Sequence, residues 1–170
     1  MTRWLGESQP LAIPANPCED VRHMAEPRVI LLVEDSDDDV FFFDRALSRV
    51  SLELQYRRAR NGQEAIDYCL GVGQFSDRKQ FPLPQLILVD LKMPICDGFD
   101  FLGWKREQPS LTYIPAIVLT SSAQDNDIRR CYELGAHSFT TKVADTVVFS
   151  HRISSLRDWW FGHCLLLPAR

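Results

Sequence analysis

Residues 86–99 read LILVDLKMPICDGF, and this stretch decides the fold. Four consecutive apolar residues end at Asp90, and an Asp-Gly pair at 97–98 precedes the next apolar segment. A short, unbroken apolar run is typical of a strand that is buried on both faces of a parallel sheet. Asp90 is therefore expected where a buried strand passes into a loop.

Four other segments have strand character. The runs 29–33 and 116–119 repeat the unbroken apolar pattern, and 53–59 and 137–141 are weaker candidates. Apolar residues at helical spacing lie between these strands, in the segments 40–50, 65–70, 99–104, 128–134 and 148–160. This alternation of strand and helix predicts a doubly wound α/β domain, with helices on both faces of a five-stranded parallel sheet.

Polar residues follow the predicted strands at the point where each ends. They are Glu34, Asp35, Asp90, Thr120 and Lys142. In an open parallel sheet, ligands bind outside the carboxyl ends of the strands, where the strand order reverses. We therefore expect these five groups to converge on one rim of the sheet.

The chemistry of this rim favours a cation and a phosphate. Carboxylates of Glu34, Asp35 and Asp90 would repel one another unless a divalent ion such as Mg²⁺ lay between them. Lys142 and Thr120 could contact phosphate oxygens. Each residue also has a plainer interpretation: the acids could stay apart in loops, Lys142 could lie on the surface, and Thr120 could cap a helix.

The acidic run continues through Asp37, Asp38 and Asp39. Acidic side chains interact favourably with the positive end of a helix dipole. We interpret these three as the solvated first turn of a helix, because charge runs usually lie on solvated faces.

Four segments in order resemble the receiver domain of two-component response regulators. They are VEDSDDD (33–39), LILVDLKMPICDGF (86–99), AIVLTSS (116–122) and GAHSFTTK (135–142). The resemblance covers residues 28 to about 160 and implies a flavodoxin-like sheet of strand order 2-1-3-4-5. The segments 68–94, 101–111 and 157–162 are further similar to small regulators that pair with bacterial phytochromes.

The resemblance implies roles at the acidic rim. Asp90 would accept a phosphoryl group from a sensor histidine kinase. Asp35, Asp90 and the backbone carbonyl of Lys92 would bind Mg²⁺, with Glu34 reaching the ion through water.

It also implies a switch that responds to the phosphoryl group. Lys142 and Thr120 would contact the phosphoryl oxygens, and Phe139 would turn inward as Thr120 moves. Families of this kind usually have proline after the lysine, but Val143 follows here. Because a non-proline cis peptide costs about 2.5–4 kcal/mol, we predict a trans bond between Lys142 and Val143.

Two other functions remain as alternatives. One is a Mg²⁺-dependent phosphohydrolase that forms an aspartyl phosphate. Such enzymes need an acid two residues after the nucleophile, whereas Lys92 occupies that position. The other is a receiver-like scaffold that is never phosphorylated, which the replacement of proline by Val143 suggests. We expect a signalling module rather than an enzyme.

The length and charge of the chain limit its domain organisation and its partners. Its 170 residues predict one receiver domain, 28–160, between a flexible leader, 1–27, and a short tail, 161–170. With 19 basic and 23 acidic residues the net charge is −4, so nucleic acid is an unfavoured partner. Without an attached effector domain, the expected output is contact with a downstream protein.

The remaining expectations concern location and association. The five cysteines form no C-x-x-C pair, and no apolar run reaches the roughly 18 residues of a membrane span, so we expect a cytoplasmic protein with reduced thiols. Cys96 is interpreted as structural, because nothing beside it clearly lowers its pKa. The apolar terminal segment 158–161, with 165–167 beyond it, is expected to pack in the core; a homodimer or kinase contact is the alternative.

Overall fold

The computed structural model describes residues 28–49, 54–122, 124–164 and 166, and its centre is one parallel sheet. The strands are β1 (Arg28–Val33), β2 (Leu54–Ala59), β3 (Leu86–Val89), β4 (Ala116–Thr120) and β5 (Ser138–Thr141). They lie in the order β2-β1-β3-β4-β5, and all four pairings are parallel. The predicted doubly wound sheet and its strand order are confirmed.

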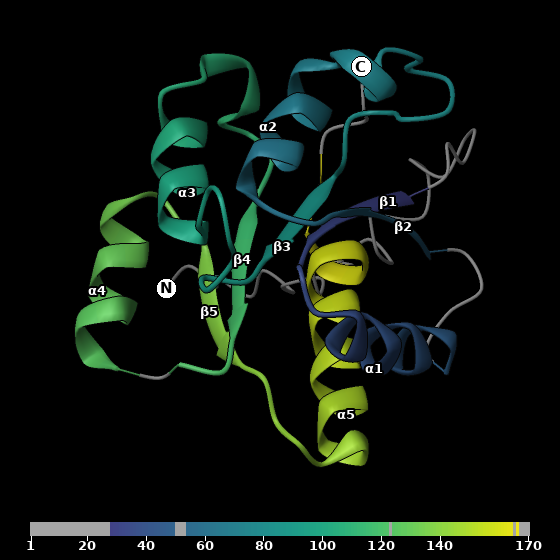
Figure 1. Ribbon diagram of the computed structural model, residues 1–170. Helices are drawn as coiled ribbons and strands as arrows, with labels where there is room; N and C mark the ends of the chain where they lie inside the picture. The colour runs from purple at the N-terminus through teal and green to yellow at the C-terminus, as the bar shows by residue number, and fades with distance from the viewer. Residues whose placement is uncertain (1–27, 50–53, 123, 165, 167–170) are drawn as a thin grey trace, which may run out of the picture.

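Five α-helices cover the two faces of the sheet (Figure 1). They are α1 (Asp37–Ser48), α2 (Gly62–Leu70), α3 (Gly98–Arg106), α4 (Asp125–Glu133) and α5 (Thr146–Arg157). Short 3₁₀ turns at Gly73–Phe75 and Pro109–Leu111 follow α2 and α3, and a π-helical segment, Asp158–His163, continues α5. None of the described helices is long and apolar enough to cross a membrane.

The sheet separates two apolar cores. On one face Leu31 and Val89 pack with residues of α2 and α3, including Tyr68 and Phe101. On the other face Leu32 and the neighbouring apolar strand residues pack with α1 and α5. Because successive strand residues point to opposite faces, a strand between two helix layers needs an apolar residue at every position. This explains the unbroken apolar runs of β1, β3 and β4.

The helices begin earlier than the apolar spacing predicts. Polar side chains at Ser36, Asn61, Asp97 and Asp145 cap α1, α2, α3 and α5, each accepting a hydrogen bond from a first-turn amide. The apolar spacing begins later than the helices because the first turns are mostly polar residues or glycine. The caps also place every one of these helix starts beside the carboxyl end of a strand.

The chain beyond α5 divides its aromatic residues between core and surface. Trp160 and Phe161 are partly buried against the core on the α1–α5 face, as predicted. The prediction is wrong for Trp159, which is 60% exposed. The Arg28 guanidinium donates to the carbonyl of Phe161 at 3.1 Å, which ties the segment to the start of β1. The leader predicted for residues 1–27, and residues 165 and 167 of the terminal segment, lie outside the described part of the chain.

Candidate phosphoryl-acceptor site

The ends of β1 and β3 bring two buried carboxylates to one rim of the sheet. The Glu34 amide donates to the carbonyl of Ala59 at 2.9 Å, and the Asp90 amide donates to the carbonyl of Val33 at 3.0 Å. These bonds extend the sheet ladder by one residue on each strand. Glu34 is 2% exposed and Asp90 7% exposed, so both acids lie at the dry edge of the core.

Three carboxylates form a cluster at this rim. One oxygen each from Glu34, Asp35 and Asp90 lie within 4.8 Å of one another, and Asp35 is exposed to solvent. Hard oxygen ligands at this separation fit a divalent cation that keeps several water molecules. The structure thus joins the three acids that the sequence analysis selected. Lys92 lies two residues beyond Asp90 with an exposed side chain.

The Asp90 carboxylate is held at both oxygens. Oδ1 accepts a hydrogen bond from the amide of Leu91 at 2.6 Å, and Oδ2 lies 2.9 Å from Nζ of Lys142. The loop beyond Asp90 folds back closely, because the Gly98 amide donates to the Leu91 carbonyl at 3.0 Å. A Cβ atom at Gly98 would collide with the Asp90 backbone carbonyl, so only glycine fits this approach.

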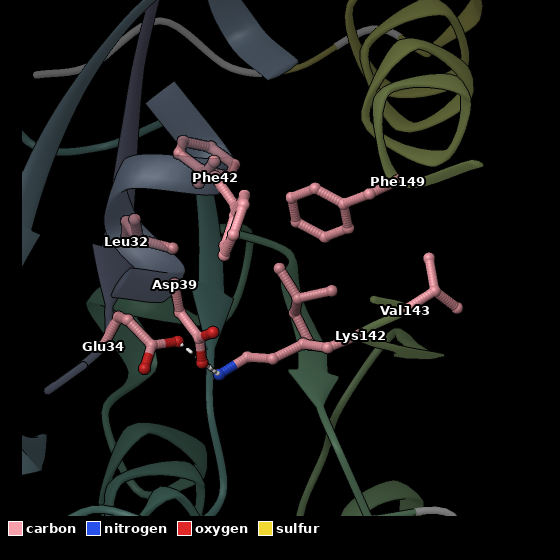
Figure 2. Close-up of a pocket in the computed structure, with 9 residues that line it drawn as sticks. Leu32, Glu34, Asp39, Phe42, Lys142, Val143 and Phe149 are labelled. Carbon is pink, nitrogen blue, oxygen red and sulfur yellow. Dashed lines mark hydrogen bonds and ion pairs between the residues drawn. The ribbon is translucent and has the colours of Figure 1, made fainter. Parts of the chain in front are cut away.

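Lys142 is the cation of the rim, and Figure 2 shows its ammonium pointing toward Glu34 and Asp39. Nζ lies 2.6 Å from Glu34 Oε2, 2.6 Å from Asp39 Oδ2 and 2.9 Å from Asp90 Oδ2. Burial alone would lower the pKa of Lys142, but its hydrogen bonds to Asp39 and Glu34 raise the pKa above the ordinary value. Lys142 therefore stays charged and compensates the buried acids.

Glu34 has the most perturbed carboxyl group of the cluster. Burial raises its pKa from 4.5 to about 7, although the ammonium of Lys142 opposes this rise. The negative charge of Asp90 acts in the same direction as burial. The repulsion among the three acids can thus be reduced in two ways, by a proton on Glu34 or by a cation bound in addition to Lys142.

Thr120, Phe139 and Val143 belong to β4, to the edge strand β5 and to the chain just after β5. Thr120 is fully buried at the end of β4, and its Oγ1 accepts a hydrogen bond from the amide of Ser122 at 3.4 Å. The Lys142 amide donates to the carbonyl of Thr120 at 2.8 Å, which fixes the two residues side by side. Phe139 is half-buried against the core. The Lys142–Val143 peptide is trans, as predicted.

Asp39 belongs to the site, which the sequence analysis missed. The structure confirms that Asp37, Asp38 and Asp39 open a helix whose cap is Ser36. The interpretation as a solvated turn is nevertheless wrong for Asp39, whose carboxylate binds Lys142. The contact joins residues 103 positions apart, and spacing within one helix cannot reveal which first-turn acid faces a distant strand.

Arg58 is a second group that the sequence analysis missed. From β2, its Nε donates to the Glu34 carbonyl at 2.9 Å and its Nη2 to the Asp35 carbonyl at 2.7 Å. Its Nη1 also donates to Asp37 Oδ1 at 2.5 Å. The Arg58 guanidinium lowers the pKa of Asp37. Arg58 thereby fixes the backbone that presents both acids of the β1–α1 loop.

The loop between β3 and α3 contains one strained residue and one cysteine. Ile95 has a φ of 70°, a conformation unfavourable for a β-branched side chain, and is 85% exposed. Burial raises the pKa of the Cys96 thiol, and Asp100 and Asp97 act in the same direction. A raised pKa leaves little thiolate at neutral pH, which agrees with the structural interpretation of Cys96.

Comparisons with known proteins agree with this geometry. Residues 30–154 match the response regulator receiver domain. The chain is 31% identical over 143 residues to the probable methanogenesis regulatory protein FilR2 of Methanothrix harundinacea, covering 84% of this chain and 90% of that protein. It is equally 31% identical over 143 residues to response regulator Rcp1 of Synechocystis, covering 84% of this chain and 95% of Rcp1.

Two solved structures share the fold. The phosphorylated cyanobacterial phytochrome response regulator RcpA superposes with a TM-score of 0.78 at 28% identity, covering 84% of this chain and all (100%) of that chain. The Mn²⁺-bound form of Rcp1 superposes with a TM-score of 0.75 at 30% identity, with 84% of this chain and 100% of that chain covered. The strand order, the acidic rim with its lysine, and the match over most of the chain agree, and the chain belongs to the response regulator receiver family.

Proposed function

We propose that Asp90 accepts a phosphoryl group from a phosphohistidine of a sensor kinase. The observation that carries the proposal is the position of the Asp90 carboxylate, which lies between a three-acid cluster and the ammonium of Lys142. A carboxylate is a competent nucleophile toward phosphorus. Its two oxygens are already oriented by the Leu91 amide and Lys142.

The transfer exchanges one bond for another. An Asp90 carboxylate oxygen bonds to phosphorus, and the bond between phosphorus and the kinase imidazole nitrogen breaks, with its electron pair staying on that nitrogen. Charge in such a transition state is spread over the phosphoryl oxygens, so positioning and positive charge supply most of the catalysis. Lys142 provides a fixed positive charge beside Asp90.

A bound Mg²⁺ supports the same chemistry. Asp35, Asp90 and the Lys92 carbonyl are the groups that would hold it, with Glu34 acting through water. Such an ion neutralises charge on the phosphoryl oxygens. The close approach of three carboxylate oxygens supports this assignment, as does the existence of a Mn²⁺-bound form of Rcp1, a relative of this chain.

The output of the proposed switch is a change in protein contacts. Thr120 would bind a phosphoryl oxygen, and Phe139 would turn inward beside it. The pairing of β4 with β5 supports this coupling, because the two strands are joined at Thr120 and Thr141. The similarity to RcpA and Rcp1 supports a phytochrome-type kinase as donor. We infer a cytoplasmic receiver of residues 28–160 that acts on a downstream protein.

The test is phosphorylation by acetyl phosphate, followed by intact mass. With Mg²⁺ present, we expect one phosphoryl group per wild-type chain and none with EDTA. Asp90→Asn should gain none. Asp97→Asn is the matched control, because asparagine can keep the helix cap at the same loop, and it should be phosphorylated normally. An adduct that persists in Asp90→Asn, or none on the wild type, would refute the proposal.

A further inference from the structure

Asp39 connects the first turn of α1 to the end of β5. Its Oδ2 lies 2.6 Å from Lys142 Nζ, and its side chain is 40% exposed. The other two carboxylates on that ammonium, Glu34 and Asp90, are 3% and 9% exposed. Among the three described partners of Lys142, Asp39 is thus the one that reaches the site from a helix rather than from a strand end.

The ammonium is already surrounded by anions. It carries three N–H donors and lies within 2.9 Å of three carboxylates, donating hydrogen bonds to Asp39 and Asp90 and forming an ion pair with Glu34. Phosphorylation converts the Asp90 carboxylate into an acyl phosphate and puts more than one anionic phosphoryl oxygen beside the same nitrogen, where Glu34 and Asp39 still lie. Of these two acids, Asp39 leaves at least cost because its exposed carboxylate can regain water.

We propose that Asp39 is a positioning residue that holds Lys142 before phosphorylation and competes with the phosphoryl oxygens for it. Phosphorylation therefore separates the first turn of α1 from the end of β5. This inference rests on the proposed function and extends it to a residue outside the acceptor, metal and switch groups. It makes α1 a second element that responds to the state of Asp90.

The surroundings of the ion pair allow such a separation. A hollow beside it is lined by apolar side chains that include Phe42, Val143 and Phe149 (Figure 2). Phe42 lies on α1 and is 41% exposed. The hollow leaves space beside the first turn of α1, whereas Val40 and Phe43 of the same helix pack in the core together with Val143. The proposed separation therefore concerns the first turn and not the whole of α1.

The chain contains a matched control for this role. Asp38 lies in the same helical turn and is exposed, and among the described residues it forms no ion pair. Asp38→Asn and Asp39→Asn remove the same charge from the same helix end. They therefore share any general effect on the helix dipole or on the attraction of an anionic donor.

The first measurement is the rate of phosphorylation by acetyl phosphate in Mg²⁺. We expect Asp39→Asn to react about threefold to fivefold faster than Asp38→Asn, which is the scale of one partly exposed ion pair. Asp39→Glu keeps the carboxylate and should react at close to the wild-type rate. Equal rates for the two asparagine variants would overturn the proposal.

The second measurement can be made first on the wild-type chain alone. Hydrogen exchange over residues 37–44 should become faster in the wild-type chain when Asp90 is phosphorylated, because Asp39 loses its partner. The change should be absent in Asp39→Asn and present in Asp38→Asn. Unchanged or slower exchange in the phosphorylated wild type would contradict the separation of α1.

The two proposals fail in different ways. A wild-type chain that gains no phosphoryl group refutes the assignment of Asp90, whatever Asp39 does. A wild-type chain that is phosphorylated normally, with equal rates in the two asparagine variants and no change in exchange, refutes only the role of Asp39.

Discussion

Two nearly buried lysines lie at opposite ends of the domain and have opposite surroundings. Lys142, at the carboxyl end of β5, is bound by three carboxylates. Lys105, in the last turn of α3, is 4% exposed, and among the described residues it pairs with no carboxylate. The pKa of Lys142 is raised, whereas burial lowers the pKa of Lys105.

The opposite pKa shifts distinguish Lys142, whose charge stabilises the acidic rim, from Lys105, whose charge has no such role. Burial acts on both ammonium groups in the same direction, so the partners decide the sign of the shift. At the acidic rim, the charge of Lys142 is needed to hold buried acids together. At the end of α3, the aliphatic part of the Lys105 side chain covers apolar surface, and its ammonium charge adds little to stability.

Removal of Lys142 tests this contrast with the largest expected effect. Lys142→Met leaves buried acids without their cation, and we expect the free energy of unfolding in EDTA at pH 8 to fall by about 3 kcal/mol. Mg²⁺ should restore more stability to this variant than to the wild type, because no ammonium competes for the acids. Urea unfolding measures both effects. Lys79→Met, at an exposed lysine, is the control; equal stability of the Lys142 variant and wild type would contradict this role of the ammonium.

The protonation of Glu34, one of the acids bound by Lys142, makes the stability of the rim depend on pH. Its pKa of about 7 in the folded chain exceeds the ordinary 4.5, so the folded state binds a proton more tightly than the unfolded state. Stability from this group is therefore complete below pH 4.5 and lost as pH rises to 7, by roughly 2–3 kcal/mol. In metal-free buffer, subtracting the profile of Glu34→Gln from that of the wild type should isolate this decline. A flat difference profile would contradict it.

Substitution of Arg58 tests whether Mg²⁺ binding at the acidic rim depends on the hydrogen bonds that hold the β1–α1 loop. Arg58→Met removes the donors to the Glu34 and Asp35 carbonyls, and we expect the affinity for Mg²⁺ to fall by about tenfold. Arg57→Met is the matched control on the same strand, because Arg57 donates to Gln80 and Tyr56 instead. Isothermal titration with Mg²⁺ compares the two. Equal affinities in the two variants would show that Arg58 does not position the loop.

Lys105 should give the smallest effect and the opposite sign. Lys105→Met keeps an unbranched side chain that is one atom shorter and removes a charge with no carboxylate partner among the described residues, so we expect the free energy of unfolding to rise by about 1 kcal/mol. The gain should shrink above the lowered pKa of Lys105, where the wild type is already neutral. Urea unfolding at pH 7 and at pH 10 checks this. A loss of stability at pH 7 would mean that Lys105 has a favourable charge contact.

The strand ends were predictable because each has a local pattern. Asp90, Thr120 and the Glu34-Asp35 pair directly follow short apolar runs, and parallel strands bring their carboxyl ends to one edge. Lys142 follows a weaker run, yet the same rule places it correctly. The α/β class and the convergence of these groups thus required only strand periodicity and sheet geometry, whereas the strand order followed from the resemblance to receiver domains.

The supporting contacts were not predictable in the same way. Asp39 and Arg58 reach the site through the rotation of α1 and the direction of a side chain on β2, which spacing along the chain does not specify. Three adjacent aspartates have three different surroundings: Asp37 binds Arg58, Asp38 is exposed and Asp39 binds Lys142. Lys105 is similar, because helical spacing predicts α3 without revealing that a lysine lies on its buried side.

Phosphorylation at Asp90 is tested most sharply by locating the phosphoryl group itself. Borohydride reduction converts an aspartyl phosphate into homoserine, which peptide mass spectrometry can assign to one residue. After treatment with acetyl phosphate and Mg²⁺, we expect homoserine at Asp90 alone. Homoserine at Asp35, Asp39 or another acid, with Asp90 unmodified, would contradict the assignment of Asp90 as the acceptor.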